Sequence, residues 1–220
     1  MKKRFDNLIT LQGITSWYAE FREKINDTIN YRHYYQELEV RRKSGVVDTI
    51  PLVIPESIVL PEVLKKSEIA VLCWGTLQTV RNPNTGKVSV FVLVEHIEPI
   101  KGDKWKYENE IVITGEIGRV KRYKVTSVQK KRICEVRLIT RDSLKGQLNK
   151  SFIPCVFFDK LATAIMFDAS ILEGQTIKIN GRLQSRQYTK MIDGTEVIFR
   201  VNEVAVDKFD TYKSEDYGCK

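Results

Sequence analysis

The sequence has little of what enzymes use for metal-assisted or nucleophilic catalysis. Its 220 residues include only two histidines, His33 and His96, and four cysteines without any C-x-x-C pair. The carboxylates are scattered, and there is no glycine-rich phosphate loop. A nuclease would need clustered carboxylates for metal ions or a placed histidine, so we expect no enzyme activity, no metal and no cofactor.

Long apolar segments are also missing. The longest apolar run is SVFVLV at 89–94, and the opening MKKRFDNL has a basic start without an apolar stretch behind it. These features predict neither a membrane span nor a secretion signal. Cys73, Cys134 and Cys155 sit in apolar, strand-like segments, which indicates small core residues in a reducing compartment. We expect a cytoplasmic, nucleoid-associated protein with no membrane partner.

The chain has an excess of positive charge, and the excess is localised. The formal net charge is +8. Residues 1–100 hold 13 Lys and Arg against 12 Asp and Glu, whereas residues 101–220 hold 23 against 16. A localised positive field attracts polyanions, either nucleic acid or an anionic membrane surface. A basic protein tuned for solubility is the plainer alternative.

Two halves of the sequence repeat one another. GTLQTVRN at 75–82 resembles GRLQSRQY at 181–188, with Gly, Leu and Gln in register. Three further pairs of segments match in the same order: NLITLQGIT (7–15) with NEIVITGEI (109–117), IPLVIP (50–55) with IPCVFF (153–158), and GKVSVFVLVE (86–95) with GTEVIFRVNE (194–203). Two copies of about 100 residues indicate a duplicated domain, because solenoids use more and shorter repeats.

Each copy is predicted to be mostly strand. Apolar and polar residues alternate through the strand segments, and one helix-like piece, 159–171, lies between the third and fourth strands of the second copy. Five strands with a helix in that place are the order of an OB-fold barrel. We therefore predict an all-β protein with short helices, made of two tandem five-stranded OB-fold barrels. The predicted domains are 1–102 and 103–208, followed by a short polar tail, 209–220.

One segment of the first copy has no counterpart in the second. SWYAEFREKINDTIN (16–30) places Tyr18, Phe21, Ile25 and Ile29 at helical spacing. We interpret it as a helix or long arm packed on its own barrel. A contact between subunits is the alternative.

The second copy carries aromatic residues where a plain barrel needs none. Ile153, Cys155 and Phe157 share one face of a strand, and Phe152 and Phe158 share the other. A barrel strand needs only its inward face apolar, so the outer rings require another reason. Cations recur on matching faces of the neighbouring strands: Arg137, Arg141, Lys178, Arg182 and Arg186, together with Tyr188.

Rings beside cations suit a flexible single strand of nucleic acid, which offers bases to stack and phosphates to neutralise. A basic run at 118–132 contains no acidic residue and could guide the phosphate backbone. Its cations are Arg119, Lys121, Arg122, Lys124, Lys130, Lys131 and Arg132. A solvated hairpin would carry the same composition.

These residues resemble those of bacterial single-stranded DNA-binding proteins. The resemblance covers roughly residues 109–207, through FIPCVFFDKLA (152–162), LEGQTIKINGRLQSRQY (172–188), DGTEVIFRVNEV (193–204) and NEIVITGEIG (109–118). It implies an OB-fold, sequence-independent binding of single-stranded DNA and no catalysis. It also implies base stacking by Phe152, Phe158 and Tyr188, with Leu144 where the family has a further aromatic residue.

The resemblance also implies an assembly. The family usually gathers four OB domains, so a chain with two is expected to form a homodimer. The sequence ends DKFDTYKSEDYGCK, without the acidic Pro-Phe tip through which such proteins recruit replication or recombination partners. In the first copy, the positions that match the three rings are Thr49, Pro55 and Asn82, so we expect it to bind DNA weakly or to serve in assembly. Trp17, Tyr31, Tyr34, Tyr35 and Trp74 could form a different aromatic surface there.

The leading hypothesis is thus a protein that coats and protects single-stranded DNA in replication, recombination, repair or DNA transfer. An OB-fold adaptor of the primosome type, with secondary nucleic-acid binding, is the alternative, because the fold alone cannot separate the two. RNA stays open as a ligand, since a stacking surface does not exclude a 2′-hydroxyl.

Overall fold

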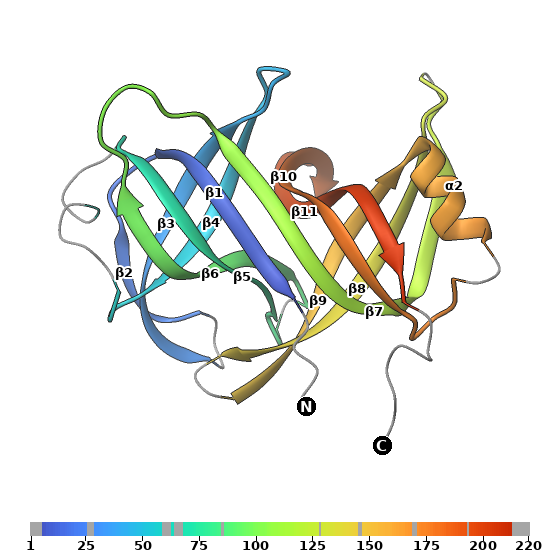
Figure 1. Ribbon diagram of the computed structural model, residues 1–220, viewed down its shortest axis with the longest axis horizontal. Coiled ribbons are helices and arrows are strands. Elements are labelled where there is room, and N and C mark those ends of the chain that lie inside the picture. The colour runs from blue at the N-terminus through green and yellow to red at the C-terminus, as the bar shows by residue number, and fades with distance from the viewer. Residues whose placement is uncertain are drawn as a thin grey trace. The chain divides into compact units, whose positions relative to one another are not determined.

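The structure is a computed structural model, and the elements that it describes are shown in Figure 1. It describes residues 6–25, 29–58, 63, 68–84, 86–127, 129–144, 147–168, 171–192 and 194–212. Within these ranges, the side chains at 119–121, 142–144, 147–149 and 192 are not described. The predicted side-chain roles of Arg119, Lys121 and Leu144 lie outside the description, as do Cys219 and most of the helix position of the first copy.

The chain divides into two compact units. The N-unit consists of Leu8–Glu110 together with Leu183–Glu203, and the C-unit consists of Met1–Asn7, Ile111–Arg182 and Val204–Lys220. The N-unit thus contains part of the second sequence copy, a grouping that differs from the predicted domain boundary at residue 102. We call residues 183–203 the arm.

The N-unit contains a closed five-stranded barrel. Its strands are β1 (Asn7–Thr15), β3 (Asn30–Arg41), β4 (Val47–Pro55), β5 (Ala70–Arg81) and β6 (Val88–Pro99). Hydrogen bonds join them in the order β1-β5-β6-β4-β3 and back to β1, and only β4 and β6 run parallel. This is the OB-fold order. A further strand, β2 (Glu20–Lys24), pairs with β3.

The C-unit repeats the same barrel. Its strands are β7 (Glu108–Val125), β8 (Arg132–Leu144), β9 (Gln147–Phe158), β10 (Thr176–Ile192) and β11 (Thr195–Thr211), and the distal parts of β10 and β11 form the arm. The pairing order is β7-β8-β9-β11-β10 and back to β7, with β9 and β11 parallel. Helix α2 (Asp159–Phe167) follows β9. The prediction of two all-β, five-stranded barrels is confirmed.

Alternation along the strands decides which side chains form the two cores. In β1, Ile9 and Leu11 are fully buried, and in β10, Ile177 and Ile179 are fully buried, while the residues between them are more exposed. Burial of apolar surface at about 25 cal/mol per Å² is the main stabilising term for such barrels. The predicted core cysteines Cys73, Cys134 and Cys155 are buried thiols. No helix within the described ranges is long and apolar enough to cross a membrane.

Close backbone approach explains why the repeat keeps its glycines. A Cβ atom at Gly75 would collide with the carbonyl oxygen of Leu93, and one at Gly181 would collide with that of Ala205. Both glycines lie where the fourth strand of a barrel crosses the fifth, so only a residue without a side chain fits. The repeated G-x-L-Q phrase therefore marks one packing constraint used in both barrels.

The repeat holds for the first, third and fourth strands but is wrong in the fifth. The sequence aligns Phe91 with Phe199, whereas the barrels place Leu93 and Ala205 in equivalent positions against the two glycines. The hairpin of the second copy is longer than that of the first. The extra residues lie in the arm and leave the barrel unchanged. The sequence alignment matched the turn glycines Gly86 and Gly194, and it therefore shifted the barrel residues of the fifth strand out of register.

Three predicted elements need correction. The helix predicted in 16–30 is wrong, because β2 pairs antiparallel with β3 and Phe21 packs edge-to-face on Tyr34 at 5.4 Å between ring centroids. The interpretation of 16–30 as a segment that packs on its own barrel is correct. The helix predicted at 159–171 ends at Phe167. Strand β11 continues to Thr211, into the segment predicted as a tail, and Phe209 packs on Phe157 at 5.7 Å.

Candidate nucleic-acid interface

Phe152 and Phe158 lie on the outer side of β9 in the C-unit. Their neighbours of opposite parity, Ile153, Cys155 and Phe157, are at most 3% exposed and form the predicted inward face. The Phe152 side chain is 42% exposed, and Phe158 is half-buried where β9 meets α2. Neither ring is sealed in the core, so the outer face of β9 presents aromatic surface to solvent.

Arginines of β8 lie beside these rings. Residues directly opposite in an antiparallel pair project to the same side of the sheet. Ile139 lies opposite Phe152, so Arg137 and Arg141, two residues to either side of Ile139, share the face of that ring. The Lys150 ammonium, which the sequence reasoning missed, lies 5.3 Å from the Phe152 ring centroid. The sequence spacing could have identified Lys150, because residues two positions apart in a strand share a face and Lys150 precedes Phe152 by two.

We call this surface the β8–β9 face. It consists of Arg137, Arg141, Lys150, Phe152 and Phe158. A cation within about 6 Å of an aromatic centroid is attracted to the ring, which holds both groups in place for a ligand. The face therefore combines apolar rings for stacking with cations for phosphate.

Among the predicted phosphate-binding cations whose side chains are described, five have a carboxylate partner in these ion pairs. The ion pairs are Arg141–Glu116 and Lys124–Glu135 at 2.6 Å, Lys178–Asp6 at 3.0 Å, Arg182–Asp207 at 3.1 Å and Arg186–Glu203 at 3.3 Å. The pKa of Lys178 is raised, chiefly by its hydrogen bond to Asp6. Surface ion pairs of this kind are worth about 0–1 kcal/mol, so a phosphate can replace the carboxylate at little cost.

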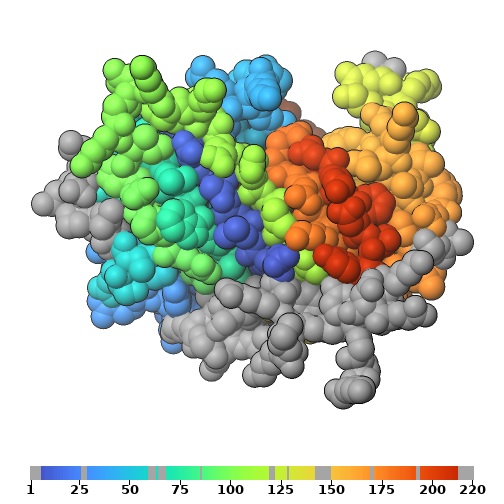
Figure 2. Space-filling view, in the orientation of Figure 1, coloured from blue at the N-terminus to red at the C-terminus, as the bar shows by residue number. Residues whose placement is uncertain are grey.

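Lys178 and Arg182 do not join the β8–β9 face. Both lie on β10, which pairs with β7 and β11 and not with the strands that carry Phe152. Figure 2 shows β10 and β11, in orange and red, side by side at the surface. The predicted single array of cations is therefore split between different parts of the barrel wall.

The basic run forms the hairpin between β7 and β8. Arg122, Lys124, Lys130, Lys131 and Arg132 are exposed. The hairpin extends past α2 in Figure 1, and Tyr123 packs on Phe167 of that helix at 5.1 Å. Since β8 continues from this hairpin into the β8–β9 face, the two basic elements are contiguous along one strand.

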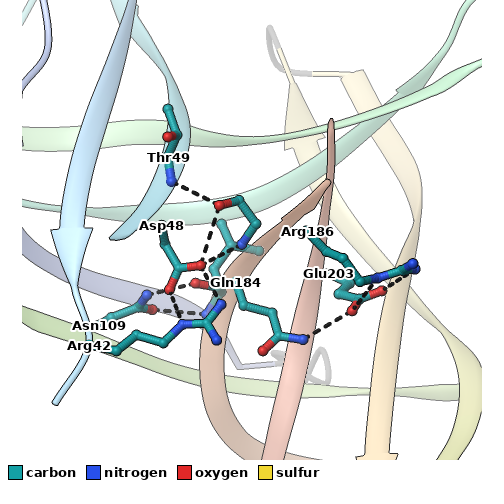
Figure 3. Close-up of polar contacts among 9 residues, drawn as sticks. Arg42, Asp48, Thr49, Asn109, Gln184, Arg186 and Glu203 are labelled. Atoms are coloured by element: carbon teal, nitrogen blue, oxygen red, sulfur yellow. Dashed lines mark hydrogen bonds and ion pairs between the residues drawn. The ribbon is translucent and has the colours of Figure 1, made fainter. Parts of the chain in front are cut away.

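Tyr188, the third predicted ring, lies on the arm in the N-unit. It stacks on Phe199 with centroids 5.4 Å apart and an interplanar angle of 16°. Arg186 and Lys190 lie 5.8 Å and 5.6 Å from its centroid, and Arg186 also pairs with Glu203 (Figure 3). The sequence reasoning missed Phe199 and Lys190. Tyr188 is thus the centre of a second cluster of rings and cations, which belongs to a different unit from the pair on β9.

The N-unit also contains a groove that sequence reasoning missed. Its volume is about 380 Å³, and it is lined by strands β2, β3, β4 and β6 and by the arm. Arg22, Lys87 and Arg200 contribute positive charge, and the Arg22 guanidinium lies 3.9 Å from the centroid of the Tyr35 ring. The sequence predicts Tyr35 as part of a different aromatic surface, but no pattern in the sequence places the three cations near it.

Burial sets the protonation of two groups in this groove. The Tyr35 hydroxyl donates to Glu37 at 3.2 Å, and burial, reinforced by Glu37, raises the pKa of Tyr35 to about 12. Burial also lowers the pKa of His33, whose Nδ1 lies 2.6 Å from the Tyr31 carbonyl oxygen. Both groups are neutral near pH 7, so the charge of the groove comes from its arginines, Lys87 and Glu37. Within the described ranges, no group of three or more His, Cys, Asp and Glu could hold a metal ion.

Comparison with known proteins agrees with this geometry. Residues 108–211 match the Single-strand binding protein family. The wild-type single-stranded DNA binding protein from Thermus aquaticus superposes with a TM-score of 0.66 at 16% identity, covering 96% of this chain and 95% of that one. A deletion mutant of the same protein gives 0.64 at 14% identity, covering 96% of each chain. No curated protein sequence matches the chain.

The structural matches establish the fold, which extends over both barrels. The family match covers the segment that contains the β8–β9 face and the basic hairpin. It coincides with the region in which the sequence resembles bacterial single-stranded DNA-binding proteins. The predicted resemblance is confirmed, because residues 108–211 match the single-strand binding protein family.

Proposed function

We propose that this protein binds single-stranded nucleic acid without sequence preference, with single-stranded DNA as the main ligand, and that it has no catalytic role. It coats and protects the exposed strand during replication, recombination, repair or DNA transfer. The observation that carries the proposal is the exposed Phe152 ring, flanked by Lys150 and Arg137 on the outer face of a family-matched barrel.

The chemistry of the β8–β9 face supports a single strand over a duplex. An exposed phenyl ring can stack on any unpaired base, which is worth about 1–3 kcal/mol per base, whereas paired bases are already stacked. Each neutralised phosphate releases counterions and makes the affinity fall with salt. Neither interaction reads the identity of a base, so the binding is expected to be independent of sequence.

A titration with fluorescent oligo-dT, a duplex of the same length and oligo-U at two salt concentrations tests this function. We expect the single strands to bind more tightly than the duplex and both to weaken as salt rises. Duplex DNA binding as tightly as oligo-dT would contradict the proposal. Tighter binding of oligo-U than of oligo-dT would make RNA the ligand.

An adaptor that mainly contacts proteins is the second candidate, and one feature of the arm favours it. Met191 and Ile198 are both 67% exposed near the arm tip. Apolar side chains exposed to this degree suit a protein partner better than a phosphate backbone. An oligo-dT affinity that does not change with salt would favour the adaptor.

We further propose that two chains associate, so that four barrels act together, and that the β8–β9 face contributes more to binding than the N-unit does. Thr49 and Pro55 stand in β4 where β9 has Phe152 and Phe158, which supports this division of labour. Light scattering of the purified chain measures the oligomeric state, and a monomer would contradict the first part. Equal losses of affinity from Phe152→Ala and Tyr35→Ala would contradict the second.

A further inference from the structure

The arm belongs to the second sequence copy but packs in the N-unit. A two-stranded hairpin that extends beyond its barrel is only marginally stable by itself. Here it contacts β4 and the start of β7 through polar groups drawn in Figure 3, and it contacts β3 through Arg200 and Glu37. Polar contacts this specific indicate that the arm has a fixed place.

Asp48 is the centre of this docking. Its side chain is fully buried, and its carboxylate accepts hydrogen bonds from Arg42 Nε and Nη2 at 2.6 and 2.5 Å. The same carboxylate accepts the backbone N–H of Ser185 at 2.7 Å (Figure 3). The Ser185 hydroxyl accepts the backbone N–H of Thr49 at 3.0 Å. A buried carboxylate is stable only when hydrogen bonds compensate its charge. The backbone N–H of Ser185 in the arm supplies one of the hydrogen bonds that Asp48 accepts.

Two further contacts hold the arm at its base and along β3. The Asn109 side-chain amide donates to the Leu183 carbonyl oxygen at 2.7 Å and accepts the Leu183 N–H at 2.9 Å, as a neighbouring strand would. Arg200 pairs with Glu37 at 3.3 Å. The arm is therefore held by both of its strands.

Docking brings binding groups of the two sequence copies together. The arm carries the Tyr188 ring with its flanking Arg186 and Lys190, and it supplies Arg200 to the groove that also contains Tyr35 of β3. If the arm were released, Tyr188 would lose its fixed position and the groove would lose one wall. The first copy has no rings at the positions that match Phe152, Phe158 and Tyr188. Its barrel nevertheless packs against the arm, which carries Tyr188.

We propose that Asp48 is a positioning residue for single-strand binding: it docks the arm so that Tyr188 and the groove form one contact surface built from both sequence copies. This inference rests on the proposed function. Asp48 itself is buried and would not contact nucleic acid. Its effect on affinity passes through Ser185 and the arm.

The test compares Asp48→Ala, Tyr188→Ala and the double variant in the full chain. Amide hydrogen exchange of residues 183–203 reports docking, and oligo-dT titration at fixed salt reports binding. We expect Asp48→Ala to speed exchange in the arm and to raise the oligo-dT Kd about tenfold, although it adds positive charge. In the Tyr188→Ala background the same change should raise Kd less than threefold, because residues that act through one another are not additive.

Two controls keep the test decisive. Asp103→Ala makes the same change of charge at an exposed position of the N-unit and should leave exchange and Kd unchanged. Asn109→Ala removes the Leu183 contacts without changing charge, and it replaces Asp48→Ala if that variant does not fold. It should speed arm exchange and raise Kd, again less so in the Tyr188→Ala background.

Each outcome decides between the proposals. A freed arm with unchanged Kd, or fully additive losses in the double variant, would overturn the role of Asp48 while single-strand binding stands. Wild-type protein that fails to bind oligo-dT would instead overturn the proposed function. Weakened binding by Tyr188→Ala together with a non-additive effect of Asp48→Ala would support both.

Discussion

Replacing Phe152 with alanine probes the centre of the β8–β9 face. The ring is 42% exposed and has a lysine ammonium 5.3 Å from its centroid, so it can stack on a base without any rearrangement of the core. Stacking contributes about 1–3 kcal/mol per base. Loss of this term should raise the oligo-dT Kd by about 5-fold to 150-fold, since about 1.4 kcal/mol is a factor of ten.

The stability of the variant should change far less than that of a core variant. A fully buried Phe contributes about 1.5–3 kcal/mol, and a little over half of this ring is covered, so we expect a loss of about 1–2 kcal/mol. Phe157, by contrast, is fully buried, and truncation to alanine there should cost about 3–5 kcal/mol. Urea unfolding would show that Phe152→Ala is folded under the conditions of the titration.

The assay is fluorescence anisotropy of labelled oligo-dT at one salt concentration, because affinities at different salt cannot be compared. Tyr18→Ala is the matched control, since it removes a 61% exposed ring from the N-unit, outside the β8–β9 face. An unchanged Kd for folded Phe152→Ala, or an equal loss for Tyr18→Ala, would refute the assignment of Phe152 as a stacking residue.

Three further results are expected. Arg137→Ala should flatten the slope of log Kd against log salt by about 0.7 for one lost phosphate contact, and an unchanged slope in the oligo-dT titration would remove Arg137 from the interface. Gly181→Ala should destabilise the protein by about 1–3 kcal/mol in urea unfolding, because the new Cβ would meet the Ala205 carbonyl oxygen; a neutral substitution would contradict that close approach. The pKa of Tyr35 is about 12 in the folded protein against 10.0 for the free group, so the free energy of unfolding falls as pH rises through this interval. Tyr35→Phe should lose less stability over the same interval, measured by the urea midpoint. An identical pH dependence of the two proteins would contradict the raised pKa.

Much of the fold could be predicted from local patterns. Alternation placed Ile153, Cys155 and Phe157 inward and left Phe152 outward, because successive residues of a strand point to opposite sides. The repeated glycines Gly75 and Gly181 aligned the two copies correctly, and the structure places each of them at an equivalent close approach of two strands. Alternation depends only on residues near one another in the chain, and a duplicated pattern can be recognised by comparing the two copies, so the sequence carries both features without reference to tertiary contacts.

The prediction failed where distant segments choose partners. Residues 16–30 have helical spacing, but Glu20–Lys24 form strand β2 because they pair with the edge of β3. The last strand of the second copy was misaligned because the arm was lengthened outside the barrel. Lys178 and Arg182 had the right parity, but the barrel order assigned them to a strand away from Phe152.

By itself, the sequence determined two barrels, their inward faces and the exposed rings of β9, since these follow from periodicity and from a duplicated pattern. Only the tertiary structure decided that the arm packs in the N-unit, with buried Asp48 bound to Ser185, and that Arg22 and Arg200 line one groove. The physical reason is that Asp48 and Ser185 lie more than a hundred residues apart in the sequence and meet only in the folded chain. No local sequence pattern specifies which donor a buried carboxylate will bind.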